Sequence, residues 1–338
     1  MQLHRVFITV IGLLISAPLV SLGESQWSTK TTFQIGGEGG WDYVTVDGQN
    51  HRLFVTRTTH TQVIDTDSGK VIGDIPGQKT SHGVAIVSKL NRGFITDGGD
   101  SGAIVVFDLT TYAVLGKIAA LPDADGIIYD EKTDRVLAVS GDGGALMTFN
   151  PDIDLQNGKV DPPIALEGKP EFLATDGSGK VYVNLVDKNA VAVVDLNSRR
   201  VIARWPVTPG GRPVGMSMDS KSRRLFIGCR NPQKLIVMNA DNGAIESSLP
   251  IGVGVDATVY YDGEAFASCR DGSLISARSG TDGFEIAQTI KTPEGARTMG
   301  IDLATHRIYL PTAEFEAATT GRPKPKPGSF MIVVIDRQ

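Results

Sequence analysis

One apolar stretch recurs along this sequence at intervals of about forty residues. It first appears as Leu53-Phe54-Val55-Thr56-Arg57. Its nearest copies are Val181-Tyr182-Val183-Asn184, Leu225-Phe226-Ile227-Gly228-Cys229-Arg230 and Ala265-Phe266-Ala267-Ser268-Cys269-Arg270. Each copy follows a turn and leads into a polar loop, after which a second apolar run ends in Asp or Asn. A regular period of this length predicts a repeat architecture.

Seven repeat units follow one another after a short leading segment. Their boundaries are Trp41–Pro76, Ser81–Leu121, Asp125–Leu166, Pro170–Val207, Pro213–Ile251, Asp256–Ile290 and Arg297–Ile335. Within each unit, short apolar runs alternate with clusters of Asp, Asn and Gly, which is typical of antiparallel strands joined by tight turns. The last unit has only three such runs, and Thr31–Ile35 precedes the first unit without a partner. We therefore expect an all-β fold, a seven-bladed β-propeller of four-stranded antiparallel blades, in which the N-terminal strand completes the last blade.

The N-terminus has the pattern of a secretory signal. Arg5 precedes a nearly uninterrupted apolar run from Val6 to Val20, and small residues allow cleavage after Gly23. The run is shorter than the ~20 residues that a membrane-spanning helix needs, although an uncleaved anchor is the alternative. We expect a signal peptide over 1–23 and a single propeller domain over 24–338, periplasmic or secreted, with no membrane span after removal of the signal.

Composition and missing motifs narrow the function. The chain is 41% hydrophobic, enough for a substantial core, and carries a formal net charge of −5. This charge disfavours nucleic acid as a partner, because non-specific binding needs an excess of Lys and Arg. The sequence contains no Gly-x-Ser-x-Gly elbow, no His-Glu-x-x-His, no phosphate-binding Gly loop and no Cys-x-x-Cys, which excludes the enzyme classes that depend on them. We expect a monomer.

The chain resembles the YVTN-repeat, or YncE-like, β-propellers of exported bacterial proteins. The stretch Val181-Tyr182-Val183-Asn184 is nearest to the motif that names the family, and the resemblance covers the whole chain after the signal. Propellers similar to this one include lactonases and cycloisomerases, whose chemistry uses His, Glu and Arg around the channel mouth. Resemblance to YncE itself implies DNA binding, which the acidic net charge opposes. The resemblance is specific for the fold and weak for the function.

Alignment of the first strands places one residue of each unit near the mouth of the central channel. These residues are Asp42, His82, Asp125, Glu171, Val214, Asp256 and Arg297. Loops of the same face add Arg57, His60, Arg230 and Arg270. Channel mouths are wet, so polar residues there need no further purpose. A polar ring above an apolar wall is nevertheless the form of a binding site, and we expect it to bind a small molecule or a protein partner.

Several carboxylates gathered on one rim require counter-charge. One solution is a divalent metal ion at the channel mouth, with ligands from Asp42, His82, Asp125, Glu171 and Asp256. The other solution is pairing with Arg57, Arg230, Arg270 and Arg297, which leaves no metal. In an enzyme of the resembled classes, His82 or Glu171 would be the general base or acid, and Arg297, Arg230 and Arg270 would stabilise a carboxylate or an oxyanion. A metal-assisted hydrolase would use the carboxylates to activate water.

Two further features leave alternatives open. Cys229 and Cys269 occupy equivalent positions in neighbouring units, where either a disulfide or two reduced, buried thiols would fit. The segment Glu314–Ser329 departs from the repeat and contains alternating Pro and basic residues, which make it extended and stiff. It is either a solvated surface loop or a basic flap over one mouth of the channel.

Overall fold

A computed structural model describes residues 26–317 and 323–338. The expected signal peptide, residues 1–23, lies outside the described residues. Within them the structure is built from strands and turns, and helix is limited to two 3-10 turns, η1 (Gly48–Asn50) and η2 (Ser88–Leu90). No helix in this part of the chain is long and apolar enough to cross a membrane.

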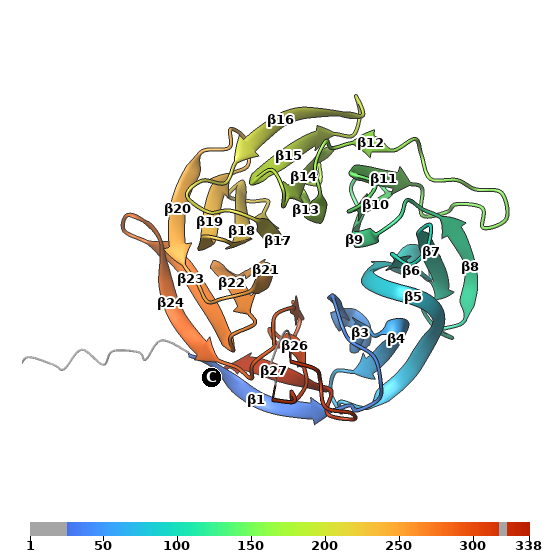
Figure 1. The fold of residues 1–338 in the computed structure, drawn as a ribbon, viewed down its shortest axis with the longest axis horizontal. Helices are drawn as coiled ribbons and strands as arrows, with labels where there is room; N and C mark the ends of the chain where they lie inside the picture. Colours follow the sequence, from blue (N-terminus) through green and yellow to red (C-terminus); the bar gives the residue numbers. More distant parts are fainter. Residues whose placement is uncertain (1–25, 318–322) are drawn as a thin grey trace, which may run out of the picture.

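The described strands form six antiparallel sheets that surround a central axis (Figure 1). Four of these sheets each contain four consecutive strands of the chain. The first two are β9 (Ala124–Asp130), β10 (Arg135–Ser140), β11 (Ala145–Phe149) and β12 (Ile164–Ala165), then β13 (Pro170–Thr175), β14 (Lys180–Leu185), β15 (Ala190–Asp195) and β16 (Arg200–Pro206). The next two are β17 (Pro213–Asp219), β18 (Arg224–Arg230), β19 (Gln233–Asn239) and β20 (Ile245–Pro250), then β21 (Val255–Tyr261), β22 (Glu264–Cys269), β23 (Ser273–Gly280) and β24 (Gly283–Lys291).

One sheet has seven strands because β5 belongs to two repeat units. The sheet contains β2 (Val44–Asp47), β3 (Arg52–Thr56), β4 (Thr58–Asp65), β5 (Val71–Val87), β6 (Arg92–Asp97), β7 (Ala103–Asp108) and β8 (Val114–Ala119). The first half of β5 pairs with β4 up to Pro76, and its second half pairs with β6 from Ser81 onward; Ser81 itself is paired on both sides, with Thr58 of β4 and Asp97 of β6. Figure 1 shows this cyan ribbon curving from the periphery of the ring towards its centre. The first two predicted units therefore meet inside one continuous strand.

The sixth sheet joins the two ends of the chain. Its order is β1 (Trp27–Gln34), β27 (Met331–Arg337), β26 (Ile308–Thr312) and β25 (Gly300–Ile301). The pairing of β1 with β27 confirms that the N-terminal strand supplies the fourth strand of the last sheet. The strand begins earlier than the predicted Thr31, because Trp27 Nε1 donates a hydrogen bond to Glu264 Oε2 at 2.6 Å. Trp27 also exchanges two backbone hydrogen bonds with the side chain of Gln288, of 2.9 and 2.7 Å.

The recurring apolar stretch forms the second strand of each sheet in which it lies. Leu53, Phe54 and Val55 are fully buried, on both faces of β3. Such strands have no solvated face, since each sheet packs against its neighbours in the ring. Phe54 of β3 contacts Phe107 of β7 with ring centroids 5.7 Å apart, an aromatic pair between the two units that β5 joins. The core is therefore distributed around the ring, and the inner strands are left to line a channel.

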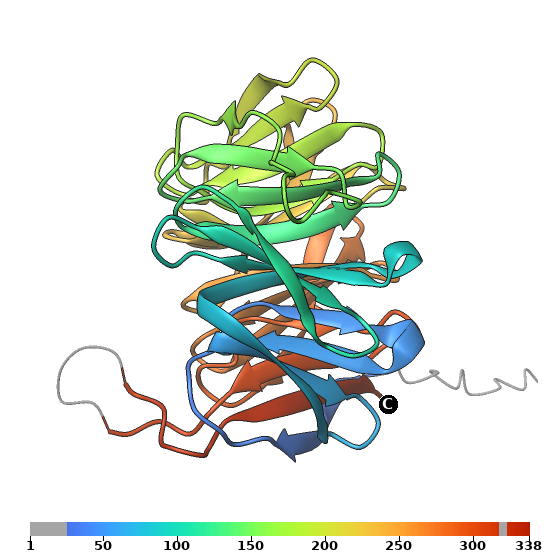
Figure 2. The same cartoon turned by 90° about the vertical axis from the view of Figure 1, so that its right-hand side faces the viewer.

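The segment Glu314–Ser329 forms a short hairpin where the structure describes it. Glu316 N donates to Lys324 O at 2.8 Å and Lys326 N donates to Glu314 O at 2.7 Å, on either side of an antiparallel bridge between Phe315 and Pro325. Figure 2 shows this red segment extending beyond one face of the ring. Backbone hydrogen bonds thus join the two described arms of the insertion.

Candidate functional site at the channel mouth

A polar side chain at the end of the recurring stretch holds the rim residue of the next unit in place. The hydrogen bonds are Thr56 Oγ1 to His82 O (2.8 Å), Thr96 Oγ1 to Asp125 O (2.5 Å), Asn184 Nδ2 to Val214 O (2.8 Å) and Ser268 Oγ to Arg297 O (2.5 Å). These four donors are fully buried. The sequence interpretation treated the stretch as core strand and missed this role. The signal was present, since Thr, Asn or Ser recurs at the end of otherwise apolar copies.

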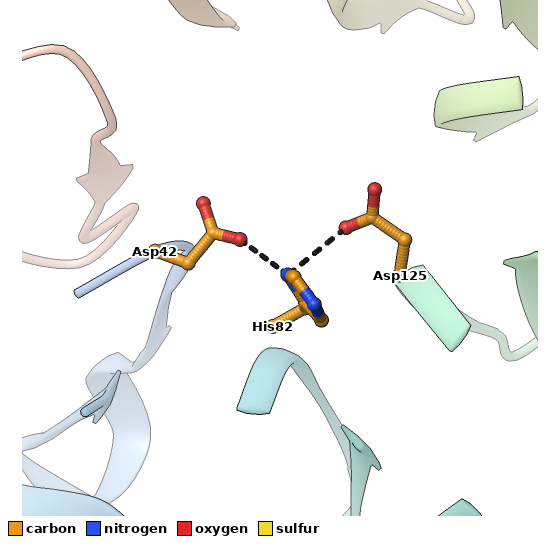
Figure 3. A group of neighbouring side chains, drawn as sticks. All are labelled: Asp42, His82 and Asp125. Atoms are coloured by element: carbon orange, nitrogen blue, oxygen red, sulfur yellow. Dashed lines mark hydrogen bonds and ion pairs between the residues drawn. The ribbon is translucent and has the colours of Figure 1, made fainter. Parts of the chain in front are cut away.

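One half of the rim is acidic and centres on His82. His82 Nδ1 donates a hydrogen bond to Asp42 Oδ2 at 2.7 Å and lies 3.6 Å from Asp125 Oδ1. Figure 3 shows the two carboxylates on either side of the imidazole, both directed at the same ring nitrogen. The three residues come from the segment before β2, from β5 and from β9. Three successive units therefore contribute to one cluster.

This arrangement makes His82 a cation at neutral pH. Burial by itself lowers the pKa of His82, but the hydrogen bond to Asp42 and the negative charges of Asp125, Asp42 and Asp123 outweigh burial and raise the pKa to about 9. The side chain of His82 is 19% exposed, so its charge is only partly screened by solvent. At neutral pH His82 is consequently an acid and a positive charge, not a free base.

Two carboxyl groups of the rim retain their protons to higher pH than usual. Burial is the largest cause for both, and it raises the pKa of Asp125 well above its usual value and also raises the pKa of Glu171. His82 opposes the shift for Asp125, and Arg230 opposes the shift for Glu171. Among the described residues, neither Asp125 Oδ1 nor the side chain of Glu171 has a hydrogen-bond partner. Glu171 is thus a protonatable group at the mouth with no partner to satisfy it.

The other half of the rim is basic and centres on Asp256. This carboxylate is only 8% exposed and pairs with two arginines, Arg230 through Oδ1 and Arg297 through Oδ2, the latter at 2.8 Å from Arg297 Nε. Arg230 Nε also donates to Val255 O at 3.0 Å. Two guanidinium groups share one carboxylate, so the group carries one positive charge in excess. Burial lowers the pKa of Arg230, while Glu171 opposes that change.

Two aromatic rings follow directly after rim residues and contact each other. Tyr43 follows Asp42 and Phe172 follows Glu171 in the sequence, and their rings meet edge to face with centroids 5.0 Å apart. Burial and the charges of Asp125, Glu171 and Asp42 raise the pKa of the Tyr43 phenol well above its usual value. Both rings belong to the wall of a cavity of about 520 Å³ that is lined mainly by apolar residues of the inner strands. The polar rim therefore adjoins an aromatic and apolar cavity wall.

Arg57 does not belong to the rim, contrary to its expected role as a ligand-binding residue. It is fully buried, and its guanidinium donates to Gln62 Oε1 at 2.6 Å and to the carbonyl oxygens of Gly36, Glu38, Gly39 and Gly40, at 2.8 to 3.2 Å. Its Cζ lies 3.7 Å above the centre of the Phe330 ring. Burial lowers the pKa of Arg57 to about 10. Arg57 positions the glycine-rich segment that leads to Asp42.

Of the other residues that the sequence singled out, Arg270 lies beside the rim residue Arg297, whereas His60 and the two cysteines lie elsewhere. His60 lies at the start of β4, where its Nδ1 is 3.2 Å from the Thr59 hydroxyl, and it is not part of the cluster around His82. Arg270 lines a small cavity together with Arg297. Cys229 and Cys269 are free and fully buried, and burial raises the pKa of each thiol to about 12. The structure thus contains the two reduced thiols and not the disulfide.

Asp42, His82 and Asp125 are the described residues that could hold a metal ion. Their three donor atoms lie within 4.8 Å of one another, whereas Glu171 and Asp256 do not join this group. The five ligands expected from the sequence therefore do not form one set. Charge balance does not demand a metal here, since protonated His82 neutralises one carboxylate and burial keeps Asp125 protonated to higher pH.

Comparison with known proteins establishes the fold. No protein-family model and no curated protein matches this sequence. Among solved structures, the chain is similar to the β-propeller domain of Cps50 (Swd1) from Myceliophteria thermophila, with a TM-score of 0.67 and 10% sequence identity. The match covers 92% of this chain and 99% of that domain. At such low identity the likeness concerns architecture alone, and this chain folds as a β-propeller.

Proposed function

We propose that this protein is an exported β-propeller that binds a small ligand through a carboxylate group at the mouth of its central channel. The observation that carries the proposal is the Arg230–Asp256–Arg297 group, which is held rigidly and keeps one positive charge in excess. A preorganised guanidinium pair is well suited to a carboxylate, because its planar donors match the two oxygens.

The unused donors of this group support an anion site. Arg297 forms an ion pair with Asp256 through Nε, and its guanidinium donates no hydrogen bond to another described residue. The side chains of Arg230 and Arg297 are 32% and 24% exposed, so a ligand can reach them from the channel mouth. Asp256 fixes the side-chain conformation of both arginines before a ligand arrives, which lowers the entropic cost of binding.

The acidic half of the rim supplies selectivity and a pH dependence. Unpartnered Glu171 is available to a hydroxyl or another polar group of the ligand. Because its pKa is raised, Glu171 loses its negative charge at a higher pH than an ordinary Glu as the solution is acidified. Carboxylate binding should therefore strengthen as the pH falls through this range. Glu171→Gln should remove that part of the pH dependence.

The test uses malonate as the probe in calorimetric and thermal-shift titrations. We expect Arg297→Gln to weaken malonate binding roughly tenfold or more, the range for a lost charge-assisted hydrogen bond. The matched control is Arg204→Gln, which removes an arginine that pairs with Glu167 on an outer strand, at 2.8 Å. Absence of malonate binding to the unaltered protein, or equal losses in both variants, would refute carboxylate binding at this rim.

A lactonase- or cycloisomerase-like enzyme is the second candidate, favoured by unpartnered Glu171 beside cationic His82 and Arg230. In that case Glu171 would be the general base, and the two cations would stabilise the oxyanion that forms on the lactone. Hydrolysis of a simple lactone such as γ-butyrolactone should then be lost in Glu171→Gln and retained in Arg204→Gln. Undetectable turnover by the unaltered protein removes this candidate.

Three features of the sequence are part of the proposal. We count seven blades of the YVTN-repeat type, because the register of β5 divides its long sheet at Pro76 and Ser81 into two units. We assign residues 1–23 to a cleaved signal, so mass spectrometry of the exported protein should find an N-terminus at Glu24. DNA binding finds less support, because the net charge of −5 provides no excess of cations.

A further inference from the structure

A second, smaller cavity opens beside the basic half of the rim. Its volume is about 160 Å³, and Trp41, Phe315, Arg297 and Arg270 line it with Pro325. Trp41 directly precedes the rim residue Asp42 in the sequence, and Arg297 belongs to the Arg230–Asp256–Arg297 group. The cavity therefore shares a cation with the proposed carboxylate site, while most of its remaining wall is aromatic or aliphatic.

The outer wall of this cavity is built by the hairpin of the insertion. The Phe315–Pro325 bridge and its two flanking backbone hydrogen bonds, of 2.8 and 2.7 Å, hold the two arms together. An ion pair of 3.0 Å between Lys326 and Glu314 adds to them. Gly295 allows Phe315 to approach closely, because a Cβ atom there would lie 2.5 Å from the ring. The position of Phe315 is thus determined by the fold.

The inner wall is held just as firmly. Trp41 packs against Phe330 and Phe315, with ring centroids 5.4 and 6.2 Å apart. The segment before Trp41 is fixed by the carbonyl contacts of buried Arg57. Trp41 Nε1 is buried and has no hydrogen-bond acceptor in the described parts of the chain. A buried donor without an acceptor is unfavourable, so a bound polar group would improve this wall.

We propose that this cavity receives the aromatic ring of a ligand whose carboxylate is bound by Arg297. This assignment rests on the proposed function and names its ligand class, an aryl carboxylate with a single ring. A cavity of about 150 Å³ with apolar walls accommodates one benzene ring, which matches the volume found here. Aromatic rings pack favourably edge to face with Trp and Phe, and they also accept a guanidinium over their faces.

The test compares benzoate with acetate in calorimetric titrations at equal ionic strength. The two probes share the carboxylate and differ in the ring. We expect benzoate to bind the unaltered protein roughly tenfold more tightly than acetate, the gain expected from burying one ring. Phe315→Ala should abolish this preference while acetate affinity stays unchanged, which also shows that the variant is folded. Lys324→Ala is the matched control on the same hairpin and should keep the preference, because Lys324 is exposed and does not line the cavity.

The outcomes separate this inference from the proposed function. Equal affinity for benzoate and acetate would overturn the inference, as would a benzoate preference that survives in Phe315→Ala. If Arg297→Gln nevertheless weakens both probes, the carboxylate site stands without the ring subsite. If neither probe binds the unaltered protein, both ideas fail.

Discussion

Replacing Asp42 with Asn should lower the pKa of His82 and remove a pH-dependent part of the stability. The hydrogen bond from His82 Nδ1 to Asp42, at 2.7 Å, would keep an acceptor in the amide oxygen of Asn but lose the negative charge. Burial would still lower the pKa of His82, and only the negative charges of Asp125 and Asp123 would remain to raise it. We expect the pKa of His82 to fall by roughly one unit or more, the usual effect of losing a nearby opposite charge.

The magnitude follows from linkage. The pKa of His82 rises from the ordinary histidine value of 6.5 to about 9 in the folded protein. At 1.36 kcal/mol for each unit, this shift corresponds to about 3 kcal/mol of folding free energy. Since the folded pKa is the higher one, the stabilisation is fully present below pH 6.5 and is lost as the pH rises through about 9. The stability difference between the unaltered protein and Asp42→Asn should therefore shrink over this window.

Two measurements check this reasoning. The imidazole carbon shifts of ¹³C-labelled histidine give the pKa directly, and His82→Gln identifies the resonance. Urea denaturation between pH 6 and 9.5 gives the stability difference. The matched control is Asp67→Asn, which removes the charge of an exposed pair with His51, 3.1 Å apart. Because solvent screens this pair, the substitution should leave the pKa of His82 and the stability of the protein almost unchanged. A His82 pKa at or below 6.5 in the unaltered protein would refute the reasoning.

Four further outcomes are expected. Arg57→Met should cost about 1–3 kcal/mol in urea denaturation, because it leaves buried Gln62 Oε1 without a donor and removes the hydrogen bonds to the carbonyl oxygens of four residues before Trp41, and a loss near zero would contradict the positioning role. Trp27→Phe should cost about 1–3 kcal/mol and speed hydrogen exchange in β1, since it leaves buried Glu264 without the indole donor; unchanged exchange would mean that this contact does not secure the closure. Cys229 and Cys269 should resist a thiol reagent at pH 8 until the protein unfolds, because burial raises their pKa to about 12, and rapid labelling of the folded protein would show otherwise. Treatment with EDTA should leave the melting temperature unchanged, and a decrease would instead indicate a metal ion held by the protein.

Much of the fold could be predicted because its determinants are local in sequence. Alternating apolar runs, Asp-Gly-type turns and the repeat period indicate antiparallel strands wherever they occur. The three-run last unit and the unpaired run near Thr31 indicated how the ring closes, and β1 pairs with β27 as expected. The boundary between the first two units was harder to predict from the sequence. The sequence suggests a break at residues 77–80, but β5 continues through them.

The rim shows what only the tertiary structure decided. Sequence alignment selected Asp42, His82, Asp125 and Asp256 as neighbours of the channel, yet it could not tell which charges pair. His82 lies between two carboxylates and Asp256 lies between two arginines because side-chain directions and distances across units determine these contacts, and no local pattern encodes them.

Arg57 and Arg230 show the same limit most clearly. Arg57 is the fifth residue of its copy of the recurring stretch and Arg230 is the sixth residue of its copy, so that Arg57 aligns with Cys229. Arg57 points into the glycine-rich segment and is fully buried, while Arg230 reaches the channel mouth. Successive side chains of an extended strand point to opposite faces, so this offset of one residue already separates the two arginines. The segment 36–40 then offers its carbonyl oxygens to Arg57. A repeat thus determines where a backbone position lies, whereas the non-repeating surroundings determine what its side chain does.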